Sequence, residues 1–361
     1  MVRLLARAIL MLLFVQQQSF AQQKILKEAV ERAEKQGFSG VILVAEDGKI
    51  LFEKAMGMRA YEDRVLLHQD DIFELASLSK QFTAMMVMIS KEKGLLDIDD
   101  QLSDYIDIPY PGISIRNLLT HTSGLPDYQT IMDKYWDKTK IAGNPEILEY
   151  LRKYAPPKYF EPGDRYDYSN TGYVLLASVV EKVTNRDFVE LSKEWIFEPL
   201  GMESTAIRTP AEKAHLPTFA AGHLTDKKGN YVNANKFKDS DYTIWLGNRK
   251  GPGRVSSTVG DLLLWDQALY TEKLISKELL EEAFSPFKLN NETRSYYGFG
   301  WEIEPKSPFG KMVKHTGDNP GYQTIIARYI EENKTIIILN NNTHPDMMRL
   351  VEAATLSLGK W

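Results

Sequence analysis

Apolar and polar positions follow different periods at the start of the chain and in its middle. Apolar residues recur at helical spacing over residues 24–36. Two continuous apolar runs follow, at residues 38–45 and 49–55, and a turn that ends in glycine separates them at residues 46–48. The chain is therefore expected to open with a helix and a two-stranded hairpin.

The helical period dominates the middle of the chain, from residue 77 to about residue 290. The most apolar helix is expected over residues 77–93, and Gly94 ends it. A polar stretch rich in glycine and proline, residues 205–255, is expected to be a loop-rich insertion at the border of a cleft. Six further helices are expected, at residues 115–121, 145–154, 171–183, 187–197, 258–270 and 277–284.

Strand patterns return near the C-terminus. They lie at residues 296–303, 311–315, 322–330 and 335–340, and a last helix is expected over residues 346–358. Strands at both ends of a helical middle predict a mixed α/β fold of the α+β type, with one antiparallel sheet from both chain ends flanked by terminal helices. The sheet lobe would take residues 22–75 and 291–361, and residues 76–290 would form an inserted, mostly helical lobe. A cleft between the lobes is the expected site.

The first 21 residues have the pattern of a secretory signal peptide. Arg3 provides the positive end, residues 4–15 are a short apolar run, and residues 19–21 form a small-x-small cleavage site. Cleavage after Ala21 would make the protein secreted or periplasmic; an uncleaved interfacial helix is the alternative. The apolar run is short for a membrane span, and the mature chain contains no longer one.

Composition narrows the classes of function. The chain of 361 residues is 43% hydrophobic and 26% charged, which is typical of a soluble globular protein. A net charge of −5 without a basic cluster argues against nucleic acid as a partner. The chain has no cysteine and no His-x-x-x-His pair, so disulfides, thiolate chemistry and a zinc hydrolase are not expected. The remaining candidate is a small-molecule or peptide substrate, without metal or organic cofactor.

Ser77 and Lys80 form a Ser-x-x-Lys pair at the start of the most apolar helix. The spacing puts Lys80 one helical turn beyond Ser77, within reach of its hydroxyl. A serine hydroxyl needs such a neighbouring base to act as a nucleophile, and the helix dipole favours negative charge at this end. The same spacing occurs at three other places, where an exposed helix pair is the simpler interpretation: Ser90/Lys93, Ser285/Lys288 and Ser357/Lys360.

Two later segments are candidates to meet Ser77 in the cleft. Tyr168 and Asn170 precede a predicted helix; the phenol could relay a proton if Lys80 lowers its pKa, and the amide could bind Lys80 and a substrate. A plain helix N-cap is the alternative for this segment. The His-x-Gly segment at residues 315–317 could bind a carboxylate or the Tyr168 hydroxyl, or it could be a turn. His121 is a rival histidine that we interpret as structural.

In this order and on these elements, the three motifs resemble those of the serine β-lactamase and penicillin-binding protein superfamily, in its class C-like branch. The resemblance covers nearly all of residues 22–361 and implies the β-lactamase/transpeptidase-like fold. It extends to five further segments, at residues 115–125, 160–163, 198–202, 256–262 and 317–322.

The resemblance implies a covalent serine mechanism. Ser77 would attack a carbonyl group and form an acyl-enzyme that water then hydrolyses, with the general-base role divided between Lys80 and Tyr168. The backbone N–H groups of Ser77 and Asp318 would form the oxyanion hole. Substrate binding would fall to Asn170, His315, Thr316 and Gly317.

The third motif bears on the substrate. Within the family that this chain resembles, class C β-lactamases have Lys-Thr-Gly at this place. The segment His315-Thr316-Gly317 is instead similar to that of D-Ala-D-Ala carboxypeptidases, D-amino-acid peptidases and esterases of the branch. The leading hypothesis is an exported hydrolase of an amide or ester in a cell-wall-type peptide. A carboxylesterase for small acyl esters is the alternative enzyme, and a catalytically idle protein that binds cell-wall fragments is the alternative outside enzymes. Residues 251–254, which end in Arg254, stand where the branch often has a glycine pair. Arg254 is expected to be a solvated loop charge, and the alternative is that it places a cation near the cleft.

Overall fold

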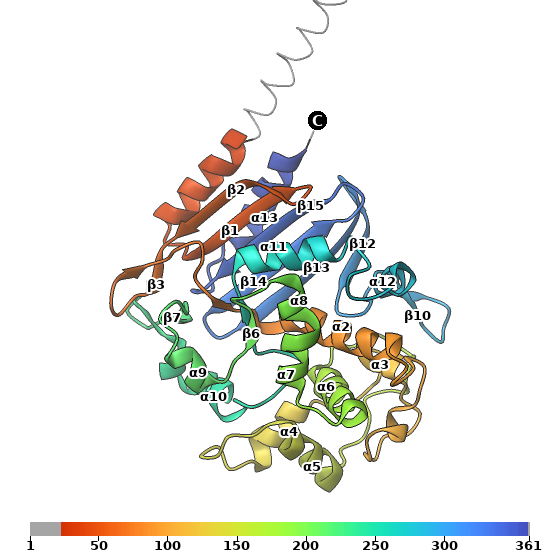
Figure 1. Ribbon diagram of the computed structural model, residues 1–361. Helices are drawn as coiled ribbons and strands as arrows, with labels where there is room; N and C mark the ends of the chain where they lie inside the picture. The colour runs from red at the N-terminus through yellow and green to blue at the C-terminus, as the bar shows by residue number, and fades with distance from the viewer. Residues whose placement is uncertain (1–22, 360–361) are drawn as a thin grey trace, which may run out of the picture.

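The structure is a computed structural model that describes residues 23–359. The expected signal peptide, residues 1–21, lies outside this range. Within it, one antiparallel sheet of six strands carries the fold (Figure 1). Its order is β12 (Glu302–Ser307), β13 (Gly310–Asn319), β14 (Tyr322–Tyr329), β15 (Lys334–Asn340), β1 (Gly40–Glu46) and β2 (Lys49–Met56). The predicted sheet from both ends of the chain is thus confirmed.

β1, the first strand of the sheet along the chain, pairs with β15, the last strand along the chain. β1 lies antiparallel to β15 over seven residue pairs, from Gly40 opposite Asn340 to Glu46 opposite Lys334. Both strands are buried almost throughout, because layers cover both faces of the sheet at its centre. A strand that is covered on both faces reads as a continuous apolar run rather than an alternation, which is what the sequence shows at these two places.

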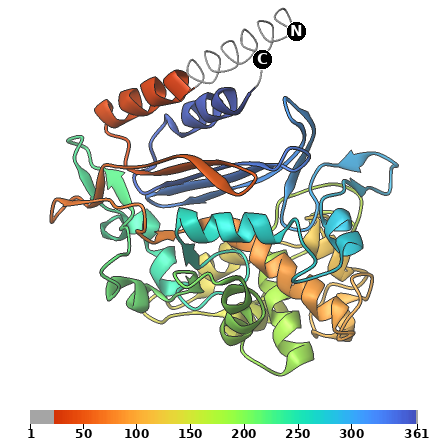
Figure 2. The ribbon, with the colours of Figure 1, turned by 45° about the horizontal axis from the view of Figure 1, so that its top comes forward.

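Helices from the two ends of the chain cover one face of the sheet (Figure 2). They are the helix at residues 23–35 and α13 (Met347–Leu358), and the sheet residues Ile42 and Ile338 belong to the same apolar cluster as both helices. α11 (Val259–Ala268) lies against the other face, where the larger apolar core begins. Among residues 23–359, no helix is both long and apolar enough to cross a bilayer.

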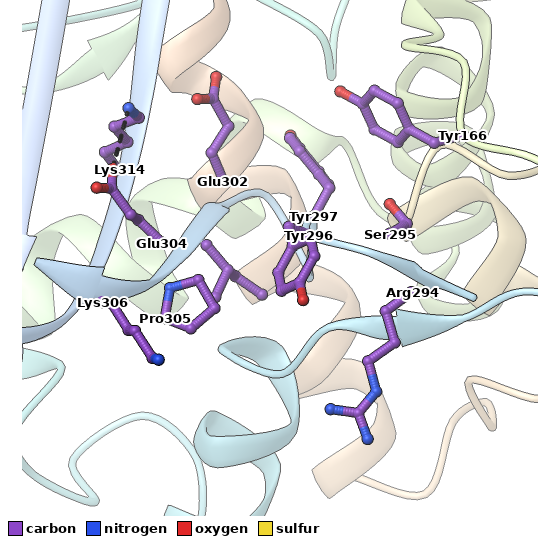
Figure 3. A pocket seen from close by; sticks show the side chains of 11 residues that line it. Tyr166, Arg294, Ser295, Tyr296, Tyr297, Glu302, Glu304, Pro305, Lys306 and Lys314 are labelled. Atoms are coloured by element: carbon purple, nitrogen blue, oxygen red, sulfur yellow. Dashed lines mark ion pairs between the residues drawn. The ribbon is translucent and has the colours of Figure 1, made fainter. Parts of the chain in front are cut away.

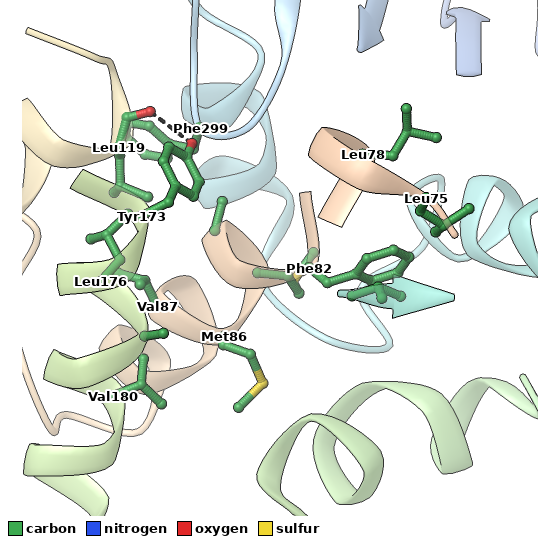
Figure 4. Packing of buried hydrophobic residues seen from close by; sticks show 14 of the residues in the cluster. Leu75, Leu78, Phe82, Met86, Val87, Leu119, Tyr173, Leu176, Val180 and Phe299 are labelled. Carbon is green, nitrogen blue, oxygen red and sulfur yellow. Dashed lines mark hydrogen bonds between the residues drawn. The ribbon is translucent and has the colours of Figure 1, made fainter. Parts of the chain in front are cut away.

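The helical lobe is built around α2 (Ser79–Glu92), which is buried over most of its surface. α2 packs beside α6 (Asn170–Thr184), where Phe82, Met86 and Val87 of α2 lie in one cluster with Leu176 and Val180 of α6 (Figure 4). The other helices are α3 (Ile115–Leu119), α4 (Tyr128–Tyr135), α5 (Asn144–Tyr154), α7 (Phe188–Ser192), α8 (Glu198–Leu200), α9 (Pro210–Ala214), α10 (Tyr242–Trp245) and α12 (Lys277–Ala283).

The expected strand at residues 296–303 is wrong in most of its length, since β12 begins only at Glu302. The preceding segment is irregular and crosses the helical lobe at close range: a Cβ at Gly300 would lie 2.9 Å from the Lys80 carbonyl oxygen. Its alternating residues Tyr297, Phe299 and Trp301 are buried, so they mimic the period of a strand.

The insertion at residues 205–255 is more ordered than the sequence suggests. It includes β6 (Ala206–Ile207), β7 (His223–Thr225) and β8 (Tyr231–Asn233), and β9 (Val255–Ser257) follows directly. β9 lies between β6 and β5 (Phe73–Glu74), which leads into the segment of Ser77. The insertion is therefore joined to the expected site through a three-stranded sheet.

Candidate active site

Ser77 lies in a strained turn against the sheet. A 3₁₀ turn, Ala76–Leu78, precedes α2, and Ala76 has a φ of +50°, which is rare for a residue with a side chain. The turn packs onto β13 at Gly317, where a Cβ atom would lie 2.2 Å from the Leu75 carbonyl oxygen. Gly317 therefore lets the turn of Ser77 approach the strand, a role that differs from the expected substrate binding.

Lys80 is completely buried at the first turn of α2, and three oxygen atoms surround its amine. Nζ lies 3.0 Å from Ser77 Oγ, 2.8 Å from Asn170 Oδ1 and 3.0 Å from the Pro252 carbonyl oxygen. Burial, and secondarily the positive charge of Arg249, lower the pKa of Lys80 well below its ordinary value. The two carbonyl oxygens can only accept hydrogen bonds, so a neutral amine donates to both and keeps its lone pair for the Ser77 hydroxyl.

Tyr168 stands next to this pair. Lys80 Nζ lies 4.7 Å from the centre of the Tyr168 ring. Burial raises the pKa of Tyr168 above its ordinary value, and a hydrogen bond with Ser77 offsets only part of that rise. The side chain is 39% exposed, which weakens the effect of burial without reversing its direction. The expectation that Lys80 lowers this pKa is therefore wrong, because the lysine charge is itself disfavoured here.

Asn170 is the first residue of α6, and Ser169 is its N-cap. The Ser169 hydroxyl accepts a hydrogen bond from the Gly172 N–H at 3.2 Å, which leaves the Asn170 amide free to bind Lys80. The helix-cap interpretation is thus correct for Ser169 alone. The cap fixes the direction in which α6 begins, and so it sets the amide beside the lysine.

The ring of His121 packs against the ring of Tyr168, a contact that the sequence did not reveal. It is buried, its Nδ1 accepts a hydrogen bond from the Ser169 N–H at 3.0 Å, and its ring centre lies 4.2 Å from that of Tyr168. Burial, chiefly, lowers the pKa of His121 well below its ordinary value, so the ring is neutral and its proton is on Nε2. The segment at residues 115–125, which includes His121, was among those that resemble the family, and this was a signal for a role at the site. The contact itself could not be predicted, because His121 and Tyr168 are far apart along the chain.

His315 lies on β13 but turns its ring into the protein. Nδ1 donates to the Thr316 carbonyl oxygen at 2.6 Å, and Nε2 accepts from the Tyr297 hydroxyl at 2.9 Å. Burial, chiefly, lowers the pKa of His315 to about 3. Both ring nitrogens are occupied, so the expected binding of a carboxylate or of the Tyr168 hydroxyl by this imidazole is wrong.

The strand beyond His315 offers an open edge. β12 pairs with β13 only as far as Lys314, opposite Glu302, so residues 315–319 continue without β12 beside them. Thr316 and Asp318 are exposed, on the face opposite to His315. Open strand edges bind extended peptide segments through backbone hydrogen bonds.

Two cavities lie at opposite ends of this open edge. One of about 830 Å³ lies at the Lys314 end, with Tyr166, Tyr297 and Glu302 in its wall (Figure 3). Another of about 560 Å³ lies at the Asn319 end and is lined largely by the insertion, including Arg254. Arg254 is only 6% exposed, so the expectation of a solvated loop charge is wrong.

Comparisons with known proteins agree with the geometry. Residues 23–359 match the family model described as Beta-lactamase. The chain is 40% identical over 313 residues to Penicillin-binding protein 4* of Bacillus subtilis, covering 85% of this chain and 69% of that protein. It is 30% identical over 315 residues to a D-aminopeptidase of Brucella anthropi, covering 84% of this chain and 56% of that protein. It is also similar to an octameric penicillin-binding protein homologue from Pyrococcus abyssi, with a TM-score of 0.78 and 27% identity, covering 93% of this chain and 76% of that one.

Proposed function

Because this chain belongs to the β-lactamase family and is a serine hydrolase, we propose that it hydrolyses an amide bond next to a D-amino acid through an acyl-enzyme on Ser77. The observation that carries the proposal is the buried Lys80 amine, 3.0 Å from Ser77 Oγ, with two carbonyl oxygens that accept its other N–H groups. The names of relatives, a penicillin-binding protein and a D-aminopeptidase, support the choice of D-amino-acid substrates.

Acylation begins with proton transfer from Ser77 to Lys80. The serine oxygen attacks the substrate carbonyl, and the negative charge on the carbonyl oxygen is stabilised by the backbone N–H groups of Ser77 and Asp318. The first N–H groups of a helical turn have no partner within the turn, which leaves the Ser77 N–H available. One donor of this kind contributes a factor of about 10²–10³ to the rate.

Release of the amine requires a proton on its nitrogen. Tyr168 is protonated and hydrogen-bonded to Ser77, so its phenol donates that proton and recovers one from the Lys80 ammonium. Water then attacks the ester carbonyl, gives a proton to Lys80, and the Ser77 oxygen leaves as a hydroxyl. Lys80 thus acts as the base and Tyr168 as the acid of the leaving group.

The neutral His315 favours a peptidase over a β-lactamase. A lysine at this place would supply a fixed positive charge, whereas the imidazole is uncharged and bonded within the protein. Thr316 and the open edge of β13 remain to bind the substrate backbone. We therefore expect penicillin to acylate the enzyme without rapid release.

The test is a fluorescent penicillin, followed by gel and by intact mass over time. We expect a lasting adduct on the mature protein and none on Ser77→Ala, together with release of D-alanine from a D-Ala-D-Ala peptide. An adduct that clears rapidly would identify a β-lactamase, and ester turnover without peptide turnover would identify a carboxylesterase. Labelling of Ser77→Ala would overturn the assignment of the nucleophile.

Export is part of the same proposal. The leader at residues 1–21 would be removed after Ala21, and the enzyme would act on cell-wall-type peptides in the periplasm or outside the cell. The intact mass of protein recovered from outside the cytoplasm should correspond to a chain that begins at Gln22.

A further inference from the structure

The cavity at the Asn319 end of β13 has a positively charged floor. Four of its lining residues are charged and less than one-tenth exposed: Glu74, Lys213, Arg249 and Arg254. Three of them are cations and one is a carboxylate, so the floor carries an excess of positive charge. We call this space the cationic cavity.

The single carboxylate is already engaged. Lys213 forms an ion pair with Glu74, and the Arg254 backbone N–H donates to Glu74 Oε1 at 3.3 Å. The Arg249 guanidinium donates Nη1 to the Tyr128 hydroxyl at 2.5 Å, and that of Arg254 donates Nη2 to the Leu246 carbonyl oxygen at 3.0 Å. Neither arginine forms an ion pair within residues 23–359, and the Nε atom of each is buried without a partner there.

Two buried guanidinium groups share the field of one carboxylate, Glu74, which is already paired with Lys213, and this arrangement is unfavourable for folding alone. Transfer of a charge out of water costs several kcal/mol unless an opposite charge or enough hydrogen bonds replace the water. Guanidinium groups also match carboxylates geometrically, because they present several N–H donors in one plane. The arrangement is explained if an anion enters the cavity during function.

The cationic cavity adjoins the nucleophile. The position of a Cβ atom on Gly253 would lie 3.5 Å from Arg249 Nη2 and 3.9 Å from the Ala76 carbonyl oxygen, so one small space separates the guanidinium from the nucleophile turn. The charge of Arg249 also contributes to the lowered pKa of Lys80. Asn319, which follows the open edge of β13, lines the same cavity.

The proposed mechanism puts the leaving group on the other side of Ser77. Tyr168, the acid of the leaving group, is on the side of Tyr297, whose ring centre is 6.2 Å away, and Tyr297 lines the cavity at the Lys314 end. A substrate along the open edge therefore directs its amine towards Lys314 and its acyl part towards Asn319.

We infer that the cationic cavity binds a carboxylate carried by the acyl part of the substrate, and that the enzyme prefers acyl groups that end in an anion. The inference rests on the proposed acyl-enzyme function. The mouth of the cavity also has Glu62 and Asp63. Glu62 is engaged by His223 at 3.1 Å and by the Asn233 N–H at 2.9 Å. With Lys236, which also lines the cavity, the four cations of the lining exceed its three carboxylates by one.

The test compares two esters that differ only at the far end of the acyl chain. One is the p-nitrophenyl half-ester of adipic acid, and the other is the same ester with the free carboxylate converted to a primary amide. We expect the unaltered enzyme to have a kcat/KM at least about tenfold higher for the half-ester, the size of one charge-assisted hydrogen bond. Arg249→Gln should abolish this preference, measured as the ratio of the two kcat/KM values within the variant, because the loss of the Arg249 charge near Lys80 acts on both esters alike.

Arg208→Gln is the matched control, because the half-buried Arg208 donates to Ser256 and does not line the cavity. It should keep the preference. Equal turnover of both esters by the unaltered enzyme, lost in Ser77→Ala, would overturn this inference and leave the proposed function intact. No turnover of either ester, or turnover that survives Ser77→Ala, would contradict the proposed function and the inference with it.

A measurement without a variant covers the case in which Arg249→Gln does not fold. Adipate and its diamide are compared as competitive inhibitors of the unaltered enzyme with a neutral ester as substrate. Tighter inhibition by adipate supports the inference, and equal inhibition contradicts it.

Discussion

At the scale of single residues, the site depends on two basic side chains that burial keeps uncharged. Lys80 and His315 are both buried beside Tyr168, and burial favours the neutral form of each. A neutral lysine is a base that is ready to accept a proton, whereas a charged one would only donate hydrogen bonds. The low polarity around Ser77 is therefore part of the chemistry.

This leads to a prediction about pH. The proposed mechanism requires unprotonated Lys80, so kcat/KM should rise with pH through the pKa of Lys80 and reach its plateau well below the 10.5 of an ordinary lysine. Asn170→Asp would place a carboxylate where the amide oxygen lies 2.8 Å from Nζ. A carboxylate this close favours the ammonium form and should move the acid limb upwards by about 1–3 pH units.

The control is Asn170→Ala, which removes the hydrogen bond without adding charge. It should reduce kcat/KM and should not move the acid limb upwards. An acid limb that stays in place in Asn170→Asp would mean that another group than Lys80 is the base.

At residue scale, the sequence predicted which residues form the site better than it predicted how deeply each side chain is buried. Ser77, Lys80, Tyr168 and Asn170 were found by their motifs, and the structure places them together. The burial of His315 was not visible, because a tripeptide does not show which face of a strand it occupies. The burial of Arg254 was not visible either, because the sequence does not show that this loop residue contacts Glu74 in the folded chain.

At the scale of elements, the site depends on how closely the nucleophile turn approaches β13. Gly317→Ala should disturb that contact, because its Cβ would lie 2.2 Å from both the Leu75 carbonyl oxygen and Thr324 Oγ1. We expect unfolding free energy to fall by about 1–3 kcal/mol, as for other overpacked sites. Displacement of the turn by about 1 Å should lower kcat about 10²-fold.

Gly260→Ala is the matched control for urea unfolding and ester kinetics. Its Cβ would meet only Thr258 Oγ1, at 3.8 Å, and it lies inside α11. It should leave both quantities nearly unchanged. Equal effects of the two substitutions would contradict a special role for the contact at Gly317.

Elements with a strong pattern were predicted and those with a mixed pattern were not. β1 and β15, at the centre of the sheet, were found because their apolar runs are continuous. The segment at residues 296–301 alternates like a strand, yet Gly298 and Gly300 bring its backbone against α12 and α2. Glycine within such a pattern is a sign of close backbone approach, and it was the available warning.

At the scale of the whole molecule, a buried ion pair joins α11 to the sheet. Arg328 of β14 and Asp266 of α11 are fully buried partners, and Asp266 also accepts from Thr335 Oγ1 of β15 at 2.8 Å. Arg328→Met should lower the unfolding free energy by about 3–5 kcal/mol, because it leaves Asp266 charged and buried without its partner.

The double variant Arg328→Met with Asp266→Leu should recover much of this loss, since no unpaired charge remains. Urea unfolding of the two single variants and the double variant forms a cycle that measures the coupling. Additive losses would show that the pair does not act as a unit.

The pairing of β1 with β15 has a consequence for the order of events during synthesis. β1 emerges from the ribosome early, but its partner is complete only when residue 340 has been made. During that interval, the helical lobe with Ser77 has been made but lacks the complete sheet, in which Gly317 of β13 contacts the turn of Ser77. Pairing across nearly the full length of the chain is slow to form. The structure around Ser77 is therefore complete only after synthesis is nearly finished, and the hydrolase should be inactive while it is being made.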